Sequence, residues 1–315
     1  MFDFRYHALS LAAVLLALAV GVVIGVAIGD SNLVSSAKSG IVHDLSSEVN
    51  NAQQQAEQAR SQLTGEETFA NDLYPIAVHG LLSGKSIGLV FFGASSNGVN
   101  GFVRDAVTQA GGDLATVVAV REPIDLAGIA RLSAGTRFAA LVPAGGEKAE
   151  AGEAGAEGAQ TPAAGELLEG FGAIVGKQLV SGGANVEREL ISRVRPRLLS
   201  AFDGQLGPLD ALVVMRNDPT KLTPEQAKAV GQLQTGLLDG VAKVGIPVVG
   251  VELSSTEPSQ IPWYQGKDLA SVDDLDTTAG QAALVYALTG SHGAYGTKST
   301  ADSLLPNVVG ATTTP

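Results

Sequence analysis

The apolar positions are spread unevenly along the chain, and the longest uninterrupted apolar run lies at residues 8–28. It carries no charge, and its one polar side chain is Ser10, whose hydroxyl can bond to a carbonyl of its own helix. These residues rise roughly 31 Å as a helix, which matches a hydrocarbon core of about 30 Å. Because a backbone in lipid must satisfy its own hydrogen bonds, the run predicts a single transmembrane helix and a membrane anchor over residues 1–30.

A cleaved signal peptide is the alternative interpretation of the same run. Ala27-Ile-Gly29 has the small-x-small form of a cleavage site, whereas the apolar run exceeds the usual length of about 7–15 residues. Arg5 precedes the run, and the next cation is Lys38. The positive-inside bias therefore favours a cell-membrane protein with a cytoplasmic N-terminus and an extracytoplasmic remainder.

Small residues recur at every fourth position of this run and form a narrow stripe along the expected helix. The stripe consists of Ala13, Ala17, Gly21, Gly25 and Gly29. Membrane helices associate through close backbone approach at such stripes, so the spacing predicts a homo-oligomer interface. Gly and Ala are also common in membrane helices generally, and ordinary composition remains the other interpretation.

Residues 33–63 are polar and rich in Gln and Ala, with apolar side chains spaced three or four residues apart. The apolar positions are Ile41, Leu45, Val49, Ala52, Ala56, Ala59 and Leu63. This period is helical and close to a heptad repeat, although alanine at most positions makes a weak coiled coil. We expect a helical stalk over residues 31–66, self-associated or solvated alone, that ends at Gly65. A separate short helix interrupted at Pro75 should follow over residues 69–82.

From residue 86 onward, short apolar runs alternate with amphipathic helical patterns. Strands are expected at residues 86–92, 114–120, 210–215 and 245–252, and helices at residues 99–110, 165–180, 185–199, 224–243 and 276–290. Thr223-Pro-Glu-Gln226 is a capping box with proline at the first helical position. The alternation predicts an α/β domain over residues 67–290, built on a mainly parallel, doubly wound sheet of about four strands.

Other segments lack a clear period. Residues 138–142 fit either a strand or a helix, and a polar loop is expected from residue 253 to residue 271. Residues 144–165 contain mostly Ala, Gly and Glu, which indicates a flexible acidic insert. Residues 291–315 are expected to form a polar, disordered tail.

Composition argues against several classes of function. The net charge of −12 argues against a nucleic-acid partner, because phosphate binding needs a basic face. The absence of cysteine excludes disulfides, thiolate metal sites and cysteine nucleophiles. The histidines, His7, His43, His79 and His292, are far apart, and no Gly-x-Ser-x-Gly elbow is present. We therefore expect no enzymatic activity, and no cofactor is evident.

Two segments could bind charged ligands, and each has a structural interpretation beside it. Gly93-Ala-Ser-Ser-Asn-Gly98 lies between a strand and a helix, where phosphates often bind, but it lacks the Gly-x-Gly-x-x-Gly spacing and fits a plain turn. Asp273, Asp274 and Asp276 precede a helix, where carboxylates could hold a hard cation or simply complement the helix dipole.

Two further segments are candidates for binding surfaces. Arg188, Arg193, Arg195 and Arg197 form the densest basic stretch, which could meet an anionic head group or polymer or could be a solvated helix face. Residues 254–264 follow the carboxyl end of an expected strand and contain Trp263, the only tryptophan. Ligand contact and aromatic packing against the sheet are both open for this segment.

Motifs at the two ends of the chain suggest a family. They are the run from Arg5 to Gly25, residues 271–281 with the helical segment after them, and Gly293-Ala-Tyr-Gly296. In combination, these motifs resemble the MctB family of actinobacterial copper transport proteins. The resemblance implies a membrane protein of copper homeostasis, described in mycobacteria as an outer-membrane channel that lowers internal copper. Copper would then be the transported ion.

The side chains of this sequence bear on that implication. Copper(I) favours Cys and Met ligands, whereas the chain has no cysteine and only Met1 and Met215. Oligomerisation could gather His7 and Arg5 of several chains into a copper-facing ring at the cytoplasmic end of a helix bundle. The second class of function is a membrane-tethered scaffold or binding protein of the cell envelope. Both classes have the lipid membrane and further copies of the chain as partners.

Overall fold

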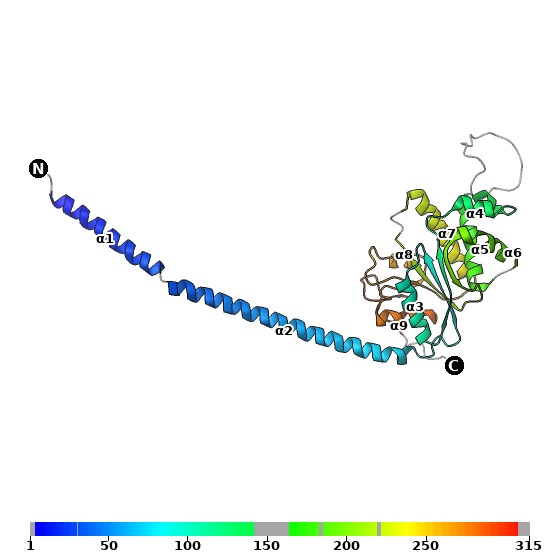
Figure 1. Cartoon of the computed structure of the whole chain (residues 1–315), viewed down its shortest axis with the longest axis horizontal. Helices are drawn as coiled ribbons and strands as arrows, with labels where there is room; N and C mark the ends of the chain where they lie inside the picture. The colour runs from blue at the N-terminus through cyan, green and yellow to red at the C-terminus, as the bar shows by residue number, and fades with distance from the viewer. Residues whose placement is uncertain (1–3, 30, 142–163, 183–184, 219–221, 308–315) are drawn as a thin grey trace, which may run out of the picture. The chain divides into compact units, whose positions relative to one another are not determined.

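The computed structural model describes residues 4–29, 31–141, 164–182, 185–218 and 222–307. The chain divides into two compact units, Met1–Thr68 and Phe69–Pro315 (Figure 1). The first unit is helical, and the second contains the sheet.

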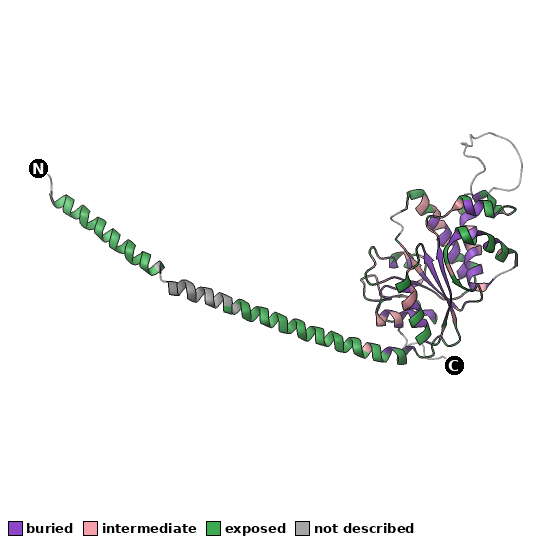
Figure 2. Ribbon diagram, viewed as in Figure 1, coloured by how far each residue is buried: buried purple, intermediate pink, exposed green. Residues whose placement is uncertain are grey.

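The first unit consists of α1 (Phe4–Ile28) and the larger part of α2 (Ser31–Val78). Within the described residues, α1 is the one helix long and apolar enough to cross a membrane, over Arg5–Ala27, and all of its described side chains are exposed (Figure 2). The Ser10 hydroxyl donates to the His7 carbonyl oxygen at 3.2 Å, as expected. The apolar helix is confirmed; a signal sequence satisfies the same criteria of length and composition.

Two expectations for the second helix are wrong. Gly65 does not end it, and no separate helix begins at residue 69, because α2 is continuous from Ser31 to Val78 and includes Pro75. The hydroxyls of Thr64 and Thr68 donate to carbonyl oxygens one turn earlier, at 2.9 and 2.7 Å. An interior glycine costs only about 1 kcal/mol relative to alanine, so the helix-forming residues around it prevail.

The second unit contains a seven-stranded sheet in the order β3-β2-β1-β4-β5-β6-β7. The strands are β1 (Ser86–Phe92), β2 (Asp113–Val120), β3 (Leu199–Gly204), β4 (Ala211–Arg216), β5 (Val248–Val251), β6 (Ala270–Val272) and β7 (Ala294–Tyr295). All neighbouring strands are parallel except β2 and β3. The central strand β1 pairs with β2 on one side and β4 on the other. The mainly parallel α/β sheet is thus confirmed.

Helices cover both faces of the sheet (Figure 1). They are α3 (Asn97–Gln109), α4 (Leu126–Leu132), α5 (Ala164–Ser181), α6 (Asn185–Leu198), α7 (Pro224–Ala242), α8 (Ile261–Gln265), α9 (Thr278–Leu288) and the 3-10 helix η1 (Arg137–Leu141). Val90 and Phe92 of β1 pack in the core cluster that includes α5, α6 and α7. Leu89 and Phe91 point to the opposite face, in the cluster that includes α3, α9 and the last turns of α2. The alternation follows from the two-residue period of a strand.

The four strands expected from apolar runs are present, and three strands were missed. β3 lies at the sheet edge with mostly exposed side chains, and β6 and β7 contain only three and two residues. Such strands carry no apolar run that a sequence pattern can reveal. The capping box at Thr223 starts α7 as expected, whereas Pro196 lies inside α6 without ending it.

The structure also shows which elements form in the segments whose sequence has no clear period. Residues 138–141 belong to the 3-10 helix η1, so a short helix forms there and not a strand, and residue 142 lies outside the described residues. The loop expected from residue 253 to residue 271 includes α8 and most of β6. Residues 291–307, assigned to a polar tail, include β7, which extends the sheet because its backbone pairs with β6. Most of the expected insert, residues 144–163, lies outside the described residues, as do residues 308–315.

Helices α5 and α7 pack with their backbones unusually close together. Each carries two glycines four residues apart at the contact, Gly172 and Gly176 on α5 and Gly236 and Gly240 on α7. A Cβ atom added to Gly176 would lie 2.0 Å from a carbonyl oxygen of α7, and one added to Gly240 would lie 2.1 Å from a carbonyl oxygen of α5. Only glycine permits this approach at these positions.

Candidate functional site

The carboxyl ends of β1 and β4 lie side by side, since these strands are parallel neighbours. The chain leaves β1 toward β2 on one side of the sheet and later returns to β4 on the other. In open α/β sheets, ligands bind in the crevice at such a reversal of strand order. The side chains around this edge therefore form the candidate site of the domain.

Arg216, the last residue of β4, is the centre of this site. Its Nε donates to Oε1 of Gln234 at 3.2 Å, and its Nη1 donates to Oε1 of Gln260. Both glutamines are buried, with exposed fractions of 1% and 4%. The guanidinium carbon lies 4.7 Å from the centre of the Trp263 ring, a cation–π distance. Neutral acceptors and an aromatic face thus fix the position of this cation at the edge of the sheet.

Glu122, just beyond β2, belongs to the same network. Gln234 donates to its Oε1 at 2.7 Å, so one buried amide links the carboxylate to Arg216. Burial raises the pKa of the Glu122 carboxyl and lowers the pKa of the Arg216 guanidinium. A Cβ atom on Gly93 would lie 2.6 Å from Nδ2 of Asn217 and 3.1 Å from the Glu122 carboxylate. The absence of a side chain at Gly93 therefore lets the turn after β1 pack against both side chains.

The segment around the only tryptophan packs against the sheet. Tyr264 is completely buried, and its hydroxyl accepts from the Arg216 backbone N–H at 2.8 Å and donates to the Val251 carbonyl at 3.1 Å. The Trp263 ring stands edge-on to Phe92, with centroids 6.2 Å apart. This is the aromatic packing that the sequence allowed, and it also places Trp263 beside the Arg216 cation.

The Gly93–Gly98 segment forms the turn into α3. Its Ser96 caps the helix, accepting from the Val99 N–H at 3.3 Å, and the Asn217 side chain donates to the Ala94 carbonyl at 2.9 Å. The Ser96 hydroxyl and the Ala94 carbonyl thus have hydrogen-bond partners within the protein, as in a plain strand-to-helix turn.

The carboxylates of Asp273 and Asp276 are used to hold loops. Asp273 accepts from the backbone N–H groups of Thr297 at 2.8 Å and Lys298 at 3.1 Å. Asp276 accepts from the backbone N–H of Ser254 at 2.7 Å and from its hydroxyl at 2.6 Å. Each carboxylate therefore fastens a different segment to the end of β6.

Asp274 differs from its neighbours. It is completely buried, and neither side-chain oxygen has a hydrogen-bond partner in the part of the chain that the structure describes. Burial, followed by the nearby charge of Asp273, raises its pKa from 3.8 to about 6. Within the described residues, no group of three or more His, Cys, Asp or Glu side chains could hold a metal ion, and Asp273, Asp274 and Asp276 do not form one.

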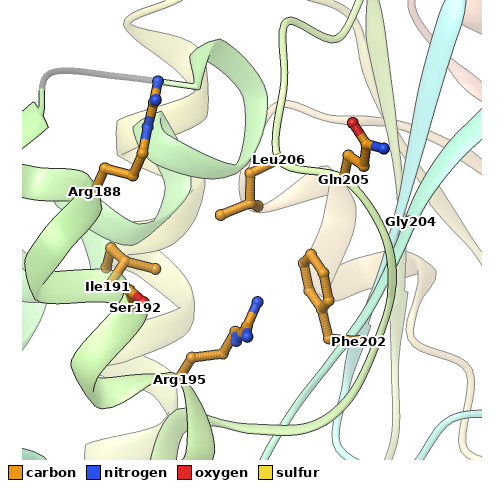
Figure 3. Close-up of a pocket in the computed structure, with 8 residues that line it drawn as sticks. All are labelled: Arg188, Ile191, Ser192, Arg195, Phe202, Gly204, Gln205 and Leu206. Carbon is orange, nitrogen blue, oxygen red and sulfur yellow. The ribbon is translucent and has the colours of Figure 1, made fainter.

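The four arginines of α6 do not form one common surface. All four arginines are exposed, and Arg197 pairs with Asp125 at 3.3 Å. Arg188 and Arg195 instead line one pocket together with β3 (Figure 3). This division could not be predicted from the sequence, since it depends on which turns of α6 face the sheet edge.

The other predicted residues lie in the first unit or far apart. Arg5, His7 and the stripe residues Ala13, Ala17, Gly21, Gly25 and Gly29 are exposed. His43, His79 and His292 are exposed as well, and the described part of one chain brings no histidines together into a group that could hold a metal ion. Sequence reasoning missed Glu122, Arg216, Gln234 and Lys298, although Glu122 and Arg216 stand at the carboxyl ends of expected strands, which is the signal that could have found them.

The chain is similar to known proteins over nearly its whole length. Residues 1–306 match the family described as "Copper transport outer membrane protein, MctB". Similar proteins include the "Copper transporter MctB" of Mycobacterium bovis and those of two Mycobacterium tuberculosis strains. Each is 26% identical over 318 residues, covering 94% of this chain and 96% of the relative. The match confirms the resemblance of the end motifs, and this chain belongs to the MctB family of copper transport proteins.

Proposed function

We propose that the chain contributes to copper homeostasis as a single-pass membrane protein, with its N-terminus in the cytoplasm and its α/β domain outside. The observation that carries the proposal is the apolar helix over Arg5–Ala27, in a chain whose family match begins at residue 1. None of that helix is buried by the rest of the chain, so lipid is the environment that suits it. The cation Arg5 precedes the helix, which favours the proposed orientation.

The proposal includes a homo-oligomer joined through the anchor and a coiled-coil stalk. Added Cβ atoms on Gly21 and Gly25 would meet nothing within 4 Å, so the stripe is open to a neighbouring helix. Along α2, the apolar side chains of Leu45, Val49 and Leu63 are 58%, 47% and 57% exposed. A second copy packed in parallel would cover both surfaces in register.

The route for copper would then belong to the assembly. His7 lies near the cytoplasmic end of the anchor, and a parallel bundle would bring one imidazole per chain to the same level. Imidazole is a suitable copper ligand, whereas the chain has no cysteine. In this proposal the chain is not an enzyme, holds no resident cofactor and has lipid and its own copies as partners.

Copper tolerance of a deletion strain tests this function. Loss of the gene should raise sensitivity to copper but not to zinc or nickel, and the wild-type chain should restore tolerance. A His7→Ala chain should fail to restore it, while a His43→Ala chain should succeed, because His43 lies on the stalk helix. Unchanged copper tolerance in the deletion strain would contradict the proposal.

A membrane-tethered envelope protein without metal transport is the second candidate. The observation that favours it is the fixed Arg216 cation at the carboxyl edge of β4, where a doubly wound α/β fold would bind a ligand. Deletion would then cause envelope defects, such as detergent sensitivity, without any selectivity for copper.

A further inference from the structure

A cavity of about 310 Å³ lies between α6 and the sheet edge formed by β3 (Figure 3). Its wall on α6 is made by Arg188, Ile191, Ser192 and Arg195, and the opposite wall by Phe202, Gly204, Gln205 and Leu206. Ile191, Ser192 and Arg195 follow Arg188 by three, four and seven positions, so the four residues share one face of the helix. The volume is at the lower end of the range for small-molecule pockets, about 300–1,000 Å³.

Arg195 carries a positive charge that the described part of the chain does not neutralise. Its guanidinium carbon lies 4.9 Å from the centre of the Phe202 ring. Within that part it makes no hydrogen bond and no ion pair, and Figure 3 shows its nitrogen atoms directed into the cavity. Stacking on Phe202 therefore orients the guanidinium and leaves its N–H donors for a ligand.

Arg188 lies one turn before Ile191 on α6, at the rim of the same cavity. Its Nε donates to the Gly182 carbonyl at 3.1 Å, and Nη2 donates to the same oxygen. This contact holds the second guanidinium beside the pocket. Among the residues that the structure describes, no Asp or Glu lines the cavity, although the chain as a whole has a net charge of −12.

We propose that this pocket binds the phosphate group of a small molecule or of a lipid head group. The phosphate would accept hydrogen bonds from Arg195 and, at the rim, face the charge of Arg188, because guanidinium groups pair well with phosphate oxygens. The hydroxyl of Ser192 and the amide of Gln205 are further polar groups in the wall. The apolar side chains of Ile191, Phe202 and Leu206 would contact the substituent of the phosphate. A copper cation would be repelled here, so the inference is independent of copper transport.

Binding to the full-length chain in an uncharged detergent tests the proposal. The probes are phenyl phosphate and glycerol phosphate, titrated by calorimetry, and phosphatidic acid added to the detergent micelles. We expect Arg195→Gln to weaken binding at least tenfold. Arg193→Gln, an exposed arginine of α6 outside the pocket, is the matched control and should leave binding unchanged.

The pattern of binding identifies the source of the phosphate. Binding of the soluble phosphates indicates a small molecule, and binding of phosphatidic acid alone indicates a lipid head group. Either result supports the site if Arg195→Gln weakens that binding at least tenfold. Arg195→Lys, which keeps the charge but loses the planar fork, should retain part of the affinity. The proposal is overturned if no probe binds at millimolar concentration, or if Arg193→Gln and Arg195→Gln weaken binding equally.

Discussion

Half-buried Lys298 and buried Glu252 form an ion pair, with Nζ and Oε1 2.6 Å apart, that ties the C-terminal segment to the end of β5. Glu252 is completely buried, and its other oxygen accepts from the backbone N–H of Gln260. The ammonium also donates to the carbonyl oxygens of Leu253 at 3.1 Å and Thr256 at 2.9 Å. One side chain from the expected tail therefore satisfies acceptors at the carboxyl edge of the sheet.

Replacing Lys298 with methionine should destabilise the domain by about 3–5 kcal/mol, because it leaves the Glu252 charge buried without its partner. Urea denaturation of the full-length chain measures the change. Lys85→Met is the control: Lys85 pairs with Asp210 at 3.0 Å but is 52% exposed, and its loss should cost less than about 1 kcal/mol. Equal losses in the two variants would show that burial of the pair contributes nothing.

Asp274 should make the protein less stable as the pH rises. Its pKa in the folded chain is about 6, above the unfolded value of 3.8, so the folded state binds the proton more tightly. This contribution is complete below about pH 4 and disappears as the pH passes 6. Between pH 5 and pH 8 the free energy of unfolding should lose about 1.4 kcal/mol through this group.

Asp274→Asn should remove that part of the pH dependence and stabilise the chain at pH 8, since a neutral amide replaces a buried charge. Urea denaturation at both pH values gives the comparison. A variant that keeps the full decline between pH 5 and pH 8 would assign the effect to other groups.

The contact between α5 and α7 should not tolerate a single methyl group. Gly240→Ala would place a Cβ 2.1 Å from the Ala173 carbonyl oxygen and should cost about 1–3 kcal/mol by forcing the helices apart. Gly231→Ala, in the same helix but with nothing within 4 Å, should instead stabilise by up to about 1 kcal/mol. Thermal unfolding should shift in opposite directions for the two variants; a shared direction would refute the packing argument.

The contact of Arg216 with Trp263, the only tryptophan of the chain, should be detectable by tryptophan fluorescence. Arg216→Leu removes the cation over the ring and two hydrogen bonds to the buried amides of Gln234 and Gln260. We expect an altered emission maximum and a loss of about 1.5–3 kcal/mol, the range for a hydrogen bond to a charged group. Arg104→Leu, an exposed position on α3, should change neither quantity.

The sequence revealed elements whose side chains repeat in a regular pattern. β1, β2, β4 and β5 were visible because their buried residues form apolar runs. β7 was not, because two residues held by pairing with β6 leave no periodic signal. The length of α2 was underestimated because a local rule, glycine as a helix end, was applied where neighbouring propensities decide the outcome.

The candidate site was harder to predict than the fold. Trp263 was singled out, but Arg216 beside it and Glu122 in the same network lie 47 or more residues away along the chain, and only the strand order brings them to one edge. The capping box at Thr223 shows the opposite case: four adjacent residues determine it, and it is present as predicted.

Tags at the two ends of the full-length chain test the central claim, that residues 1–30 remain attached and cross the membrane once. Intact cells would be treated with an impermeant labelling reagent, and membranes would then be recovered. We predict one membrane-bound species that retains both tags, with the C-terminal tag labelled and the N-terminal tag protected. A water-soluble species that has lost the N-terminal tag would contradict the account.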